Sequence, residues 1–285
     1  MPSFPAPIYV CGATASGKTA HALRLAEEHD GEIVNADAFQ LFRRIEIISA
    51  APSEQEKSLF PHHLFGVLEP GEHCDAGRYC EMVAPVISEL QARGKTPIIV
   101  GGSGLYLKFL THGPSPLPKG DEVLRTKLDA RTTEDLLEEL ETLDPVEAAQ
   151  VNRGNKRYVS RSLEICLLTG GKVSELRDGW ELKTRELDQN LTGYWLVRER
   201  EELHRRIALR THQMLDEGAI EEVEKLDGIG GNWEKAIGVK EIRRYLGGEI
   251  SRDECEELIV FATRQYAKRQ ETWFRRERWL QRMEL

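Results

Sequence analysis

Short apolar runs alternate with longer amphipathic stretches over the first third of the chain. Three of the runs have the length of strands: residues 8–11, 32–35 and 96–100. The last of them is continuously apolar, which is typical of a parallel strand buried on both faces. Because strand-like and helix-like patterns alternate here, the sequence predicts an α/β sheet that is flanked by helices on both faces.

A helical stripe lies between the second and third of these strands, at residues 76–93. Its apolar face consists of Tyr79, Val83, Val86 and Leu90. Pro85 lies within the stretch, where a proline removes a backbone hydrogen bond and clashes with the preceding turn. We therefore expect a kink or a late start in this helix.

The pattern changes after residue 113. Prolines at positions 114, 116 and 118 predict a stiff linker, which is followed by charged amphipathic helices without β-branched runs. One helix would place Leu136, Leu140 and Leu143 on one face, and the next would begin at Asp144 as its cap with a proline in its first turn. These features predict a helical insert at residues 114–189.

Residues 193–197 return to a strand pattern, which would rejoin the sheet, and long helices follow to the C-terminus. The predicted core therefore consists of residues 1–113 together with residues 190–285.

A phosphate-binding sequence follows the first predicted strand and precedes a helical pattern. It fits G-x-x-x-x-G-K-[ST] and consists of Gly12, Ala13, Thr14, Ala15, Ser16, Gly17, Lys18 and Thr19. Glycines let the backbone wrap a phosphate, and the helix N-terminus offers unpaired N–H groups. Lys18 would neutralise the outer phosphates, and the Thr19 hydroxyl would ligate Mg²⁺. The alternative is a glycine-rich turn without a ligand.

Two further polar positions follow predicted strands. Asp37 comes shortly after the second strand, and Ser103 lies among the glycines at residues 101–104, after the third. The carboxyl ends of parallel strands form the edge at which α/β sheets bind ligands. Asp37 could hold Mg²⁺ through water or accept a proton, and the glycines would let a ligand approach Ser103. A helix cap at Asp37 and a tight strand-to-helix turn at Ser103 are the structural interpretations.

Arg210 falls on an apolar helical stripe. The stripe consists of Leu203, Ile207, Arg210 and Met214, at steps of four, three and four. A guanidinium on such a face needs a partner, because an unpaired buried charge is very costly. A phosphate group is a good bidentate partner. An ion pair with a protein carboxylate, or a position at the rim of the packed face, is the alternative.

The composition narrows the class of protein. Hydrophobic residues make up 40% of 285 residues, enough for a globular fold. No run approaches the ~18 apolar residues of a membrane span, and the N-terminus lacks the pattern of a signal peptide. Five scattered cysteines without a C-x-x-C motif fit free thiols in a reducing compartment. We therefore expect a cytoplasmic protein without a membrane segment.

The net charge of −9 argues against indiscriminate binding of nucleic acid, but the charge is uneven. Residues 153–161 contain four basic and no acidic residues, and residues 264–282 contain seven basic and two acidic ones. A C-terminal helix would carry on one face Arg264, Lys268, Arg275, Arg278 and Arg282. Its opposite side would offer for packing Ile259, Ala262, Tyr266 and Trp273. A basic face with aromatic residues nearby suits RNA, whereas a solvated helix face is the alternative.

His62 and His63 are adjacent, which is not a metal-ligand spacing. We interpret both as structural residues.

Taken together, these segments resemble the tRNA dimethylallyltransferases, also called tRNA isopentenyltransferases, of the bacterial type. Besides the phosphate loop and Asp37 with Gln40, the resemblance rests on residues 61–64, 100–107, 115–118, 161–165, 236–241, 262–270 and 272–274. The last two segments are highly specific, and the motifs cover nearly the whole chain in the family's order. The resemblance implies a P-loop NTPase-like parallel sheet with a helical insert, in a monomer.

The resemblance also implies a reaction. The family transfers a dimethylallyl group from dimethylallyl diphosphate to N6 of the adenosine 3′ of the anticodon in tRNA. The catalytic residues implied for this chain are Asp37, as general base, together with Ser103 and Arg210. The phosphate loop, Mg²⁺ on Thr19, and Arg210 would hold the diphosphate as it leaves. Ser103 stands where the family usually has threonine, and both residues supply a hydroxyl.

The insert and the C-terminal helix would clamp the anticodon stem-loop of the tRNA. The positions that the resemblance assigns to tRNA contact are Asp37, Ala38, Phe39, Gln40, Ser103, Arg125, Arg157, Tyr158, Val159, Ser160, Arg161, Arg264 and Lys268.

The chain departs from the family pattern at three further positions. Ala38 stands where serine is usual, Ala51 where lysine is usual, and Tyr158 where arginine is common. These changes touch the substrate-side loop and the insert, but not the residues implied in catalysis. Three further functions therefore stay open: a catalytically weak RNA-binding paralogue, a small-molecule kinase that uses the loop for ATP, and an enzyme that prenylates free adenine nucleotides.

Overall fold

The chain divides into two compact units. The computed structural model describes residues 4–114 and 117–285, and residues 112–189 form a unit of their own. The other unit comprises the residues up to 111 and from 190 onward. The predicted boundaries were 113/114 and 189/190. The predicted linker and the motif at 115–118 lie partly outside the described residues.

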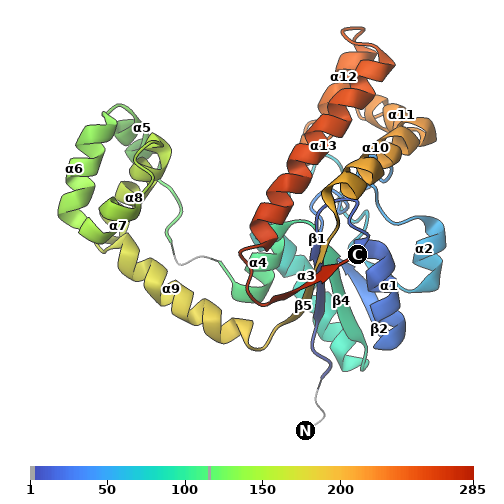
Figure 1. Cartoon of the computed structure of the whole chain (residues 1–285), viewed down its shortest axis with the longest axis horizontal. Coiled ribbons are helices and arrows are strands. Elements are labelled where there is room, and N and C mark those ends of the chain that lie inside the picture. Colours follow the sequence, from blue (N-terminus) through green and yellow to red (C-terminus); the bar gives the residue numbers. More distant parts are fainter. Residues whose placement is uncertain (1–3, 115–116) are drawn as a thin grey trace. The chain divides into compact units, whose positions relative to one another are not determined.

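The first unit is built on a six-stranded sheet with the order β3-β2-β4-β1-β5-β6 (Figure 1). Its strands are β1 (Ile8–Gly12), β2 (Gly31–Asn35), β3 (His62–His63), β4 (Thr96–Gly101), β5 (Thr192–Val197) and β6 (Leu280–Glu284). Every pairing in the sheet is parallel. The predicted strands in β1, β2, β4 and β5 are confirmed. β5 pairs directly with β1, so the chain returns to the centre of the sheet after the insert.

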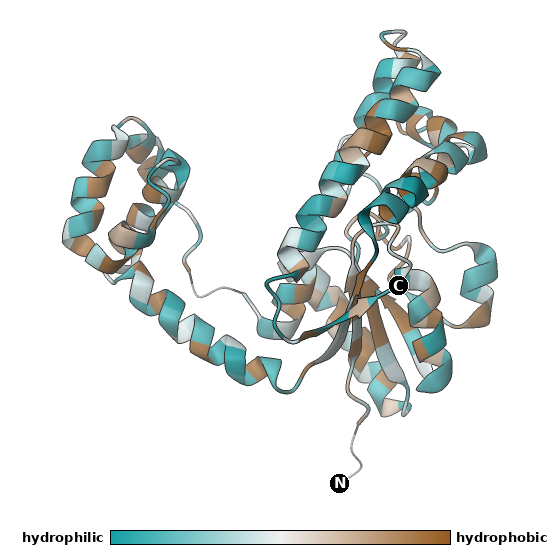
Figure 2. Cartoon of the chain, in the orientation of Figure 1, coloured by the Kyte–Doolittle hydropathy of each residue, from teal (hydrophilic) through white to brown (hydrophobic). Residues whose placement is uncertain are grey.

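Both faces of the sheet are buried, because successive side chains of a strand point to opposite sides. In β1, Tyr9 and Cys11 belong to one apolar cluster, whereas Ile8 and Val10 belong to another. Figure 2 shows the strands largely in the apolar colour. The cluster around Val10 is closed by α1 (Lys18–Glu28), and helices on the opposite face close the other. The predicted α/β class with a parallel sheet and flanking helices is confirmed.

The remaining helices of this unit are mostly C-terminal. They are α2 (Glu54–Leu59), α3 (Ala76–Ala92), α4 (Gly104–His112), α10 (Arg200–Glu217), α11 (Ala219–Glu224), the 3-10 helix η1 (Asn232–Lys235), α12 (Val239–Leu246) and α13 (Arg252–Phe274). Helices α2 and α13 begin with capping boxes at Ser53 and Ser251. In each box the serine side chain accepts from the backbone N–H of Glu56 or Glu254, and that glutamate side chain accepts from the serine N–H. α10 lies along α13 near the carboxyl ends of the central strands (Figure 1).

Helix α3 is continuous through Pro85. It begins at Ala76, where the Asp75 side chain accepts a hydrogen bond from the Arg78 N–H, so the predicted late start was wrong. The predicted stripe is confirmed, because Tyr79, Val83 and Leu90 are fully buried. Pro85 is exposed, and water can therefore reach the carbonyl that the proline leaves unbonded.

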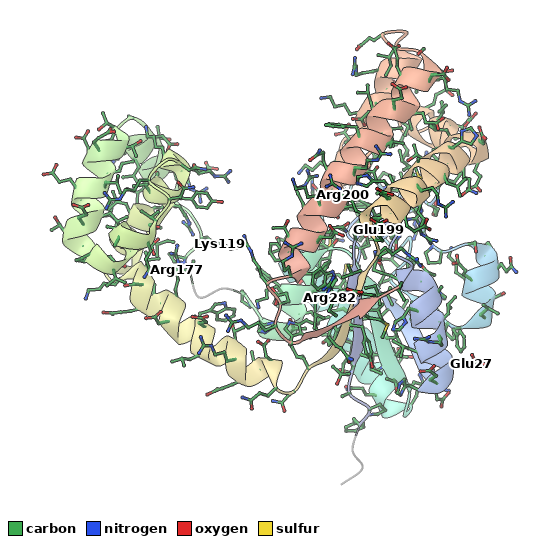
Figure 3. The ribbon with its side chains drawn as sticks, viewed as in Figure 1. Glu27, Lys119, Arg177, Glu199, Arg200 and Arg282 are labelled. Carbon is green, nitrogen blue, oxygen red and sulfur yellow. The ribbon has the colours of Figure 1, made fainter. Side chains whose placement is uncertain are left out.

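The C-terminal basic helix is shorter than predicted. α13 ends at Phe274, and Arg282 lies on strand β6 at the edge of the sheet (Figures 1 and 3). No glycine or proline stops the helix, but Phe274 and Leu280 are buried, and the Trp279 ring packs edge-on against Tyr9 at 5.3 Å. Burial of these side chains turns the chain back onto the sheet. Arg275, Arg278 and Arg282 therefore do not share a helix face with Lys268.

The insert is helical, as predicted, and has its own core. Its helices are α5 (Glu122–Asp129), α6 (Thr133–Leu143), α7 (Pro145–Gln150), α8 (Lys156–Thr169) and α9 (Val173–Asp188). Leu136 and Leu140 are fully buried in this core, but Leu143 is 39% exposed because α6 ends there. Asp144 caps α7 with Pro145 in its first turn, which confirms that prediction.

Two findings concern the expected environment of the protein. In the ranges that the structure covers, no helix has both the length and the apolar character needed to cross a membrane. All five cysteines are free thiols.

Gly101, at the end of β4, has no room for a side chain. A Cβ atom there would lie 2.0 Å from the Ala36 carbonyl oxygen, which is a backbone atom directly after β2 and cannot turn away as a side chain can. We expect Gly101→Ala to lower the free energy of unfolding by about 3 kcal/mol or more, measured by urea denaturation. Gly71→Ala is the matched control, since no atom lies within 4 Å of its Cβ position. Equal midpoints for the two variants would contradict the expectation.

Candidate active site

The phosphate loop, residues 12–19, forms a compact turn between β1 and α1, which we call the cradle. Gly17 precedes α1 with φ at 101°, a conformation that favours glycine. A Cβ on Gly12 would lie 2.8 Å from Ser16 Oγ and 2.9 Å from the Leu196 carbonyl oxygen. Ser16 Oγ is buried, with no hydrogen-bond partner among the described residues. Both glycines are therefore needed for the loop's shape, and a polar atom inside it is unsatisfied.

Lys18 folds back over this cradle. Its Nζ donates to the Gly12 carbonyl at 3.1 Å and to the Ala13 carbonyl at 2.8 Å. Burial lowers the pKa of Lys18 to about 8, although the charge of Asp37 opposes the shift. An anion in the cradle would favour the charged form of this amine.

Asp37 is held at the carboxyl end of β2 by a buried asparagine. The Asn35 side chain accepts from the Asp37 N–H at 2.8 Å and donates to the Asp37 and Leu64 carbonyls at 3.0 and 2.9 Å. Asp37 Oδ1 accepts from the Phe39 N–H at 3.1 Å, within a turn that starts no helix. The interpretation of Asp37 as a helix cap is therefore wrong.

The electrostatic surroundings of Asp37 suit a proton acceptor. Burial raises the pKa of the Asp37 carboxyl, and the charges of Lys18 and Arg210 oppose that shift without cancelling it. A carboxylate with a raised pKa is a better base than an exposed one.

Ser103 supports the loop that carries Asp37. Its Oγ accepts a hydrogen bond from the Ala38 N–H at 2.9 Å, so the backbone of residue 38 makes this contact whatever its side chain. Two of the three glycines around Ser103 admit protein rather than ligand. A Cβ on Gly102 would lie 2.1 Å from Gln270 Nε2, and one on Gly104 would lie 2.3 Å from the Trp273 ring. At these two positions tight packing of α13 replaces the expected approach of a ligand, whereas Gly101 lines a pocket that the phosphate loop also lines.

Arg210 reaches the phosphate loop, as its position on the apolar stripe required. Leu203, Ile207 and Met214 are buried, and Arg210 Nη1 donates to Thr14 Oγ1 at 3.3 Å. Burial lowers the pKa of Arg210. Within the described ranges no carboxylate oxygen pairs with this guanidinium, so the structure offers no protein ion pair for it. Among the described residues the guanidinium thus faces the cradle without a direct ion pair, although the charges of Asp37 and Glu56 act on it.

Two further arginines hold the loop, and the sequence patterns did not identify them. Arg206 Nε donates to the Ala15 carbonyl at 2.9 Å, and Arg198 Nε donates to the Ser16 carbonyl at 2.9 Å. The spacing of Arg206 from Arg210, one helical turn, was the available signal. These contacts add to the excess of positive charge around the loop.

Gln270 was also missed as an individual residue. This buried side chain of α13 accepts from the Thr14 N–H at 2.8 Å and donates to the Gly102 carbonyl at 3.0 Å. Periodicity alone gave no signal for it, because a buried glutamine is defined by partners that are far away in the sequence.

These groups line two adjoining pockets. The larger, about 360 Å³, is bounded by the phosphate loop, Asp37, Gln40, Arg206 and Arg210. The smaller is bounded mainly by apolar side chains, among them Phe39, Met214, Ile237 and Tyr266. Asp37 and Arg210 line both pockets. A polar, cationic chamber thus meets an apolar one at the carboxylate.

Thr19 and Asp37 are the residues that could hold a metal ion in this site. Both line the larger pocket. No cluster of three or more His, Cys, Asp or Glu side chains suited to a metal occurs in the described part of the chain. Mg²⁺ commonly uses one or two protein oxygens and completes its shell with water and phosphate. The donor set therefore fits Mg²⁺ that arrives with a phosphate ligand.

His62 and His63 belong to the sheet, and their side chains make structural contacts. His63 Nε2 lies 2.7 Å from Glu32 Oε2, and His62 Nδ1 lies 2.8 Å from the Phe60 carbonyl. His62 also lines the larger pocket, which the sequence did not indicate.

Of the basic positions on α13, Lys268 is exposed and Arg264 is half-buried. Lys268 and Arg269 of this helix, together with Trp273 and with Arg276 just beyond its end, line an open depression. Trp273 is 40% exposed, so its predicted role in packing is only partly correct. A basic surface with an accessible aromatic ring is therefore present on the core unit.

In the insert, Arg125 and Arg161 both contact Glu164. Arg125 Nε lies 3.1 Å from Glu164 Oε1, and Arg161 pairs with Glu164 Oε2 and with the Pro118 carbonyl. Glu164 is buried, so these pairs hold α8 against the start of α5. Their charge is partly neutralised within the insert.

The remaining predicted RNA contacts in the insert lie at the start of α8. Arg157 and Tyr158 are exposed there, whereas Val159 and Ser160 are buried in the insert's own core. The side chains of Val159 and Ser160 therefore pack inside the insert, and the assignment of these two positions to tRNA contact stays a prediction.

The chain is similar to known proteins over almost its whole length. A family model described as IPP transferase matches residues 40–277. The tRNA dimethylallyltransferase of Akkermansia muciniphila is 41% identical over 276 residues, which cover 97% of this chain and 92% of that protein. The tRNA dimethylallyltransferase of Geobacter sulfurreducens is 39% identical over 278 residues, covering 95% and 89%.

Solved structures agree with this relationship. The tRNA isopentenylpyrophosphate transferase of Bacillus halodurans matches with a TM-score of 0.71 at 32% identity, over 99% of this chain and 90% of that chain. A eukaryotic dimethylallyltransferase acting on tRNA matches with a TM-score of 0.76 at 27% identity, over 98% of this chain and 74% of that chain. On the strength of its matched motifs, its sheet order and these similarities over almost its full length, the chain belongs to the IPP transferase family.

Proposed function

We propose that this protein transfers the dimethylallyl group of dimethylallyl diphosphate to N6 of the adenosine 3′ of the anticodon in tRNA. The observation that carries the proposal is the meeting of the two pockets at Asp37. One pocket offers cations and loop N–H groups to a diphosphate. The other offers apolar walls to an allylic chain and a purine. Membership of the IPP transferase family supports this function.

The reaction follows from the positions of these groups. The loop N–H groups, Lys18 and Arg210 bind the diphosphate, whose charge grows as its oxygen separates from the allylic C1. The N6 amine forms the new bond to C1, and the electron pair of the broken C1–O bond leaves with the diphosphate. Asp37 takes the proton that N6 loses. Mg²⁺, held by Thr19, would neutralise part of the phosphate charge.

The adenosine must leave the anticodon loop to reach Asp37. Enzymes that modify a base commonly take it out of the stack into a pocket lined by apolar and aromatic side chains. Phe39 and Tyr266 in the smaller pocket are suited to that contact.

A single-turnover assay tests the proposal. The protein is incubated with dimethylallyl diphosphate and an anticodon stem-loop, and the digested RNA is analysed by mass spectrometry. Adenosine that carries one added dimethylallyl group is the expected product. Unmodified adenosine despite binding of the stem-loop would instead support a weak paralogue, which the substitutions at Ala38 and Ala51 motivate.

Two further arms of the assay test for an enzyme of free nucleotides and for a kinase. Equal prenylation of AMP and of the stem-loop would favour an enzyme for free nucleotides. Turnover of ATP in the presence of small alcohols, without prenylation, would favour a kinase. The exposed basic surface of α13 has no purpose in either of these reactions.

The titration of Lys18 predicts a pH dependence. With a pKa near 8 in the free enzyme, Lys18 loses its charge as the pH rises through that value. We expect kcat/KM for dimethylallyl diphosphate to fall above pH 8, whereas kcat stays level because the bound anion keeps Lys18 protonated. Steady-state kinetics over a range of pH measures both. Lys18→Arg does not titrate there, so an alkaline fall retained by this variant would contradict the assignment.

The basic surfaces predict a salt-dependent contribution to RNA affinity. We expect Lys268→Gln on α13, and Arg157→Gln on the insert, each to weaken stem-loop binding. Each should reduce the slope of log K against log salt by about 0.7, the value for one phosphate contact on a single strand. Fluorescence anisotropy at several salt concentrations measures the slope, with Lys225→Gln as control. An unchanged slope would mean that these are merely solvated helix faces.

A further inference from the structure

Gln270 is the only buried glutamine among the described residues, and it lies in the core of the site. It lies on α13 between Ala267 and Phe274, both of which are buried and fix the helix against the sheet. Its side chain is 5% exposed, yet both atoms of its amide are satisfied. Oε1 accepts from the Thr14 N–H at 2.8 Å, and Nε2 donates to the Gly102 carbonyl at 3.0 Å.

These two contacts connect opposite halves of the site. On one side, Thr14 belongs to the phosphate loop, and its hydroxyl also accepts from Arg210 Nη1 at 3.3 Å. On the other side, Gly102 precedes Ser103, whose Oγ accepts from the Ala38 N–H at 2.9 Å. Ala38 directly follows Asp37. Three hydrogen bonds, joined by the peptide links Gly102–Ser103 and Asp37–Ala38, therefore connect the diphosphate cradle to the base.

The chemistry of the link requires a glutamine. An amide supplies one acceptor and one donor at a fixed separation, whereas a carboxylate supplies no donor and an asparagine is one methylene shorter. The backbone leaves space for that amide, because a Cβ on Gly102 would lie 2.1 Å from Gln270 Nε2. Gly102 and Gln270 are thus two parts of one contact.

We propose that Gln270 is a positioning residue that sets the distance between the diphosphate cradle and Asp37. This inference rests on the proposed function. Bond formation requires the allylic carbon and the amine to be held at near-attack distance, and an error of about 1 Å can cost roughly 100-fold in rate. Loss of the link lets the cradle and the Asp37 loop move independently. The chemical step then slows, while the affinity for each substrate changes little because each still binds through its own contacts.

The primary test compares Gln270→Met, which keeps the length but removes both hydrogen bonds, with the wild-type protein. The Tm is measured first, and the single-turnover rate, KM for dimethylallyl diphosphate and stem-loop Kd are then measured at a temperature below the unfolding transition. We expect the rate to fall about 10–100-fold, with KM and stem-loop Kd changed less than about threefold. Gln281→Glu, at an exposed position on β6, controls for differences between protein preparations and for the negative charge that Gln270→Glu adds. Gln270→Glu should resemble Gln270→Met, because it cannot donate to Gly102.

A double-mutant cycle separates positioning from stability. In Gly102→Ala the new Cβ displaces the Gln270 amide while residue 270 stays a glutamine. This variant should therefore show the same fall in rate as Gln270→Met. Because both changes break the same contact, Gly102→Ala with Gln270→Met should be little slower than either single variant. Additive losses, or losses accounted for by the folded fraction at the measured Tm, would overturn the proposal. A loss confined to stem-loop Kd would instead make Gln270 an RNA contact.

The outcomes also distinguish this inference from the proposed function. Absence of prenylation by the wild-type protein removes both. Normal wild-type prenylation with an unaltered rate in Gln270→Met removes only the role of Gln270.

Discussion

Replacing Asp37 by asparagine is expected to lower the prenylation rate by about 100-fold to 10,000-fold, the usual contribution of a general base. Asparagine retains the Oδ1 atom that accepts from the Phe39 N–H, so the turn and its neighbours should keep their geometry. Binding of the stem-loop and of the diphosphate should change little. Single-turnover rates, with Kd for each substrate measured separately, give the result.

The exposed Asp227→Asn is the control for Asp37→Asn, and its rate should equal that of the wild-type protein. The raised pKa of Asp37 adds a second signature. Protonation of the carboxyl should reduce kcat/KM at a higher pH than an ordinary aspartate would, and this acid limb should vanish in the asparagine variant. Near-normal turnover of Asp37→Asn would remove Asp37 as the base.

The second large effect is expected for Arg210→Ala. Removal of a half-buried cation that faces the phosphate loop should lower kcat/KM for dimethylallyl diphosphate by about 100-fold. We expect a clear rise in KM, because the guanidinium binds the diphosphate in the ground state, and a fall in kcat, because charge on the leaving group grows in the transition state. Steady-state kinetics with saturating stem-loop measures both.

Arg200→Ala provides the matched control for Arg210→Ala. Arg200 is the first residue of the same helix, is exposed, and is labelled with its cap residue Glu199 in Figure 3. It makes no contact with the phosphate loop among the interactions described, so its kinetic constants should match those of the wild-type protein. If KM is unchanged in Arg210→Ala, the arginine serves the packing of α10 and does not bind the substrate.

Local patterns in the sequence were sufficient for much of the fold. The continuous apolar run at residues 96–100 predicted a buried central strand, and strand β4 is buried along its whole length. The cap at Asp144 and the insert's helical character followed from neighbouring residues alone. These features succeed because burial of a strand and capping of a helix depend on side chains within a few positions of one another.

Local patterns failed where a distant contact outweighed them. The basic positions after residue 264 continued a helical spacing, but burial of Phe274 and Leu280 against the sheet ended the helix and created β6. Similarly, the family resemblance assigned Val159 to tRNA contact, yet its side chain is buried in the core of the insert. Charge spacing shows which residues share a face only while the helix continues.

The candidate site shows the same division. Sequence alone determined the phosphate loop, the acid at Asp37 and the inward-facing Arg210, because each is marked by residue type, spacing or the cost of burying a charge. Only the tertiary structure decided that Arg198, Arg206 and Gln270 hold the loop. Thr14 and Gln270 are separated by 256 positions, and their hydrogen bond exists only because α13 packs across the ends of the strands. A sequence records which groups need partners, whereas the folded chain selects the partners.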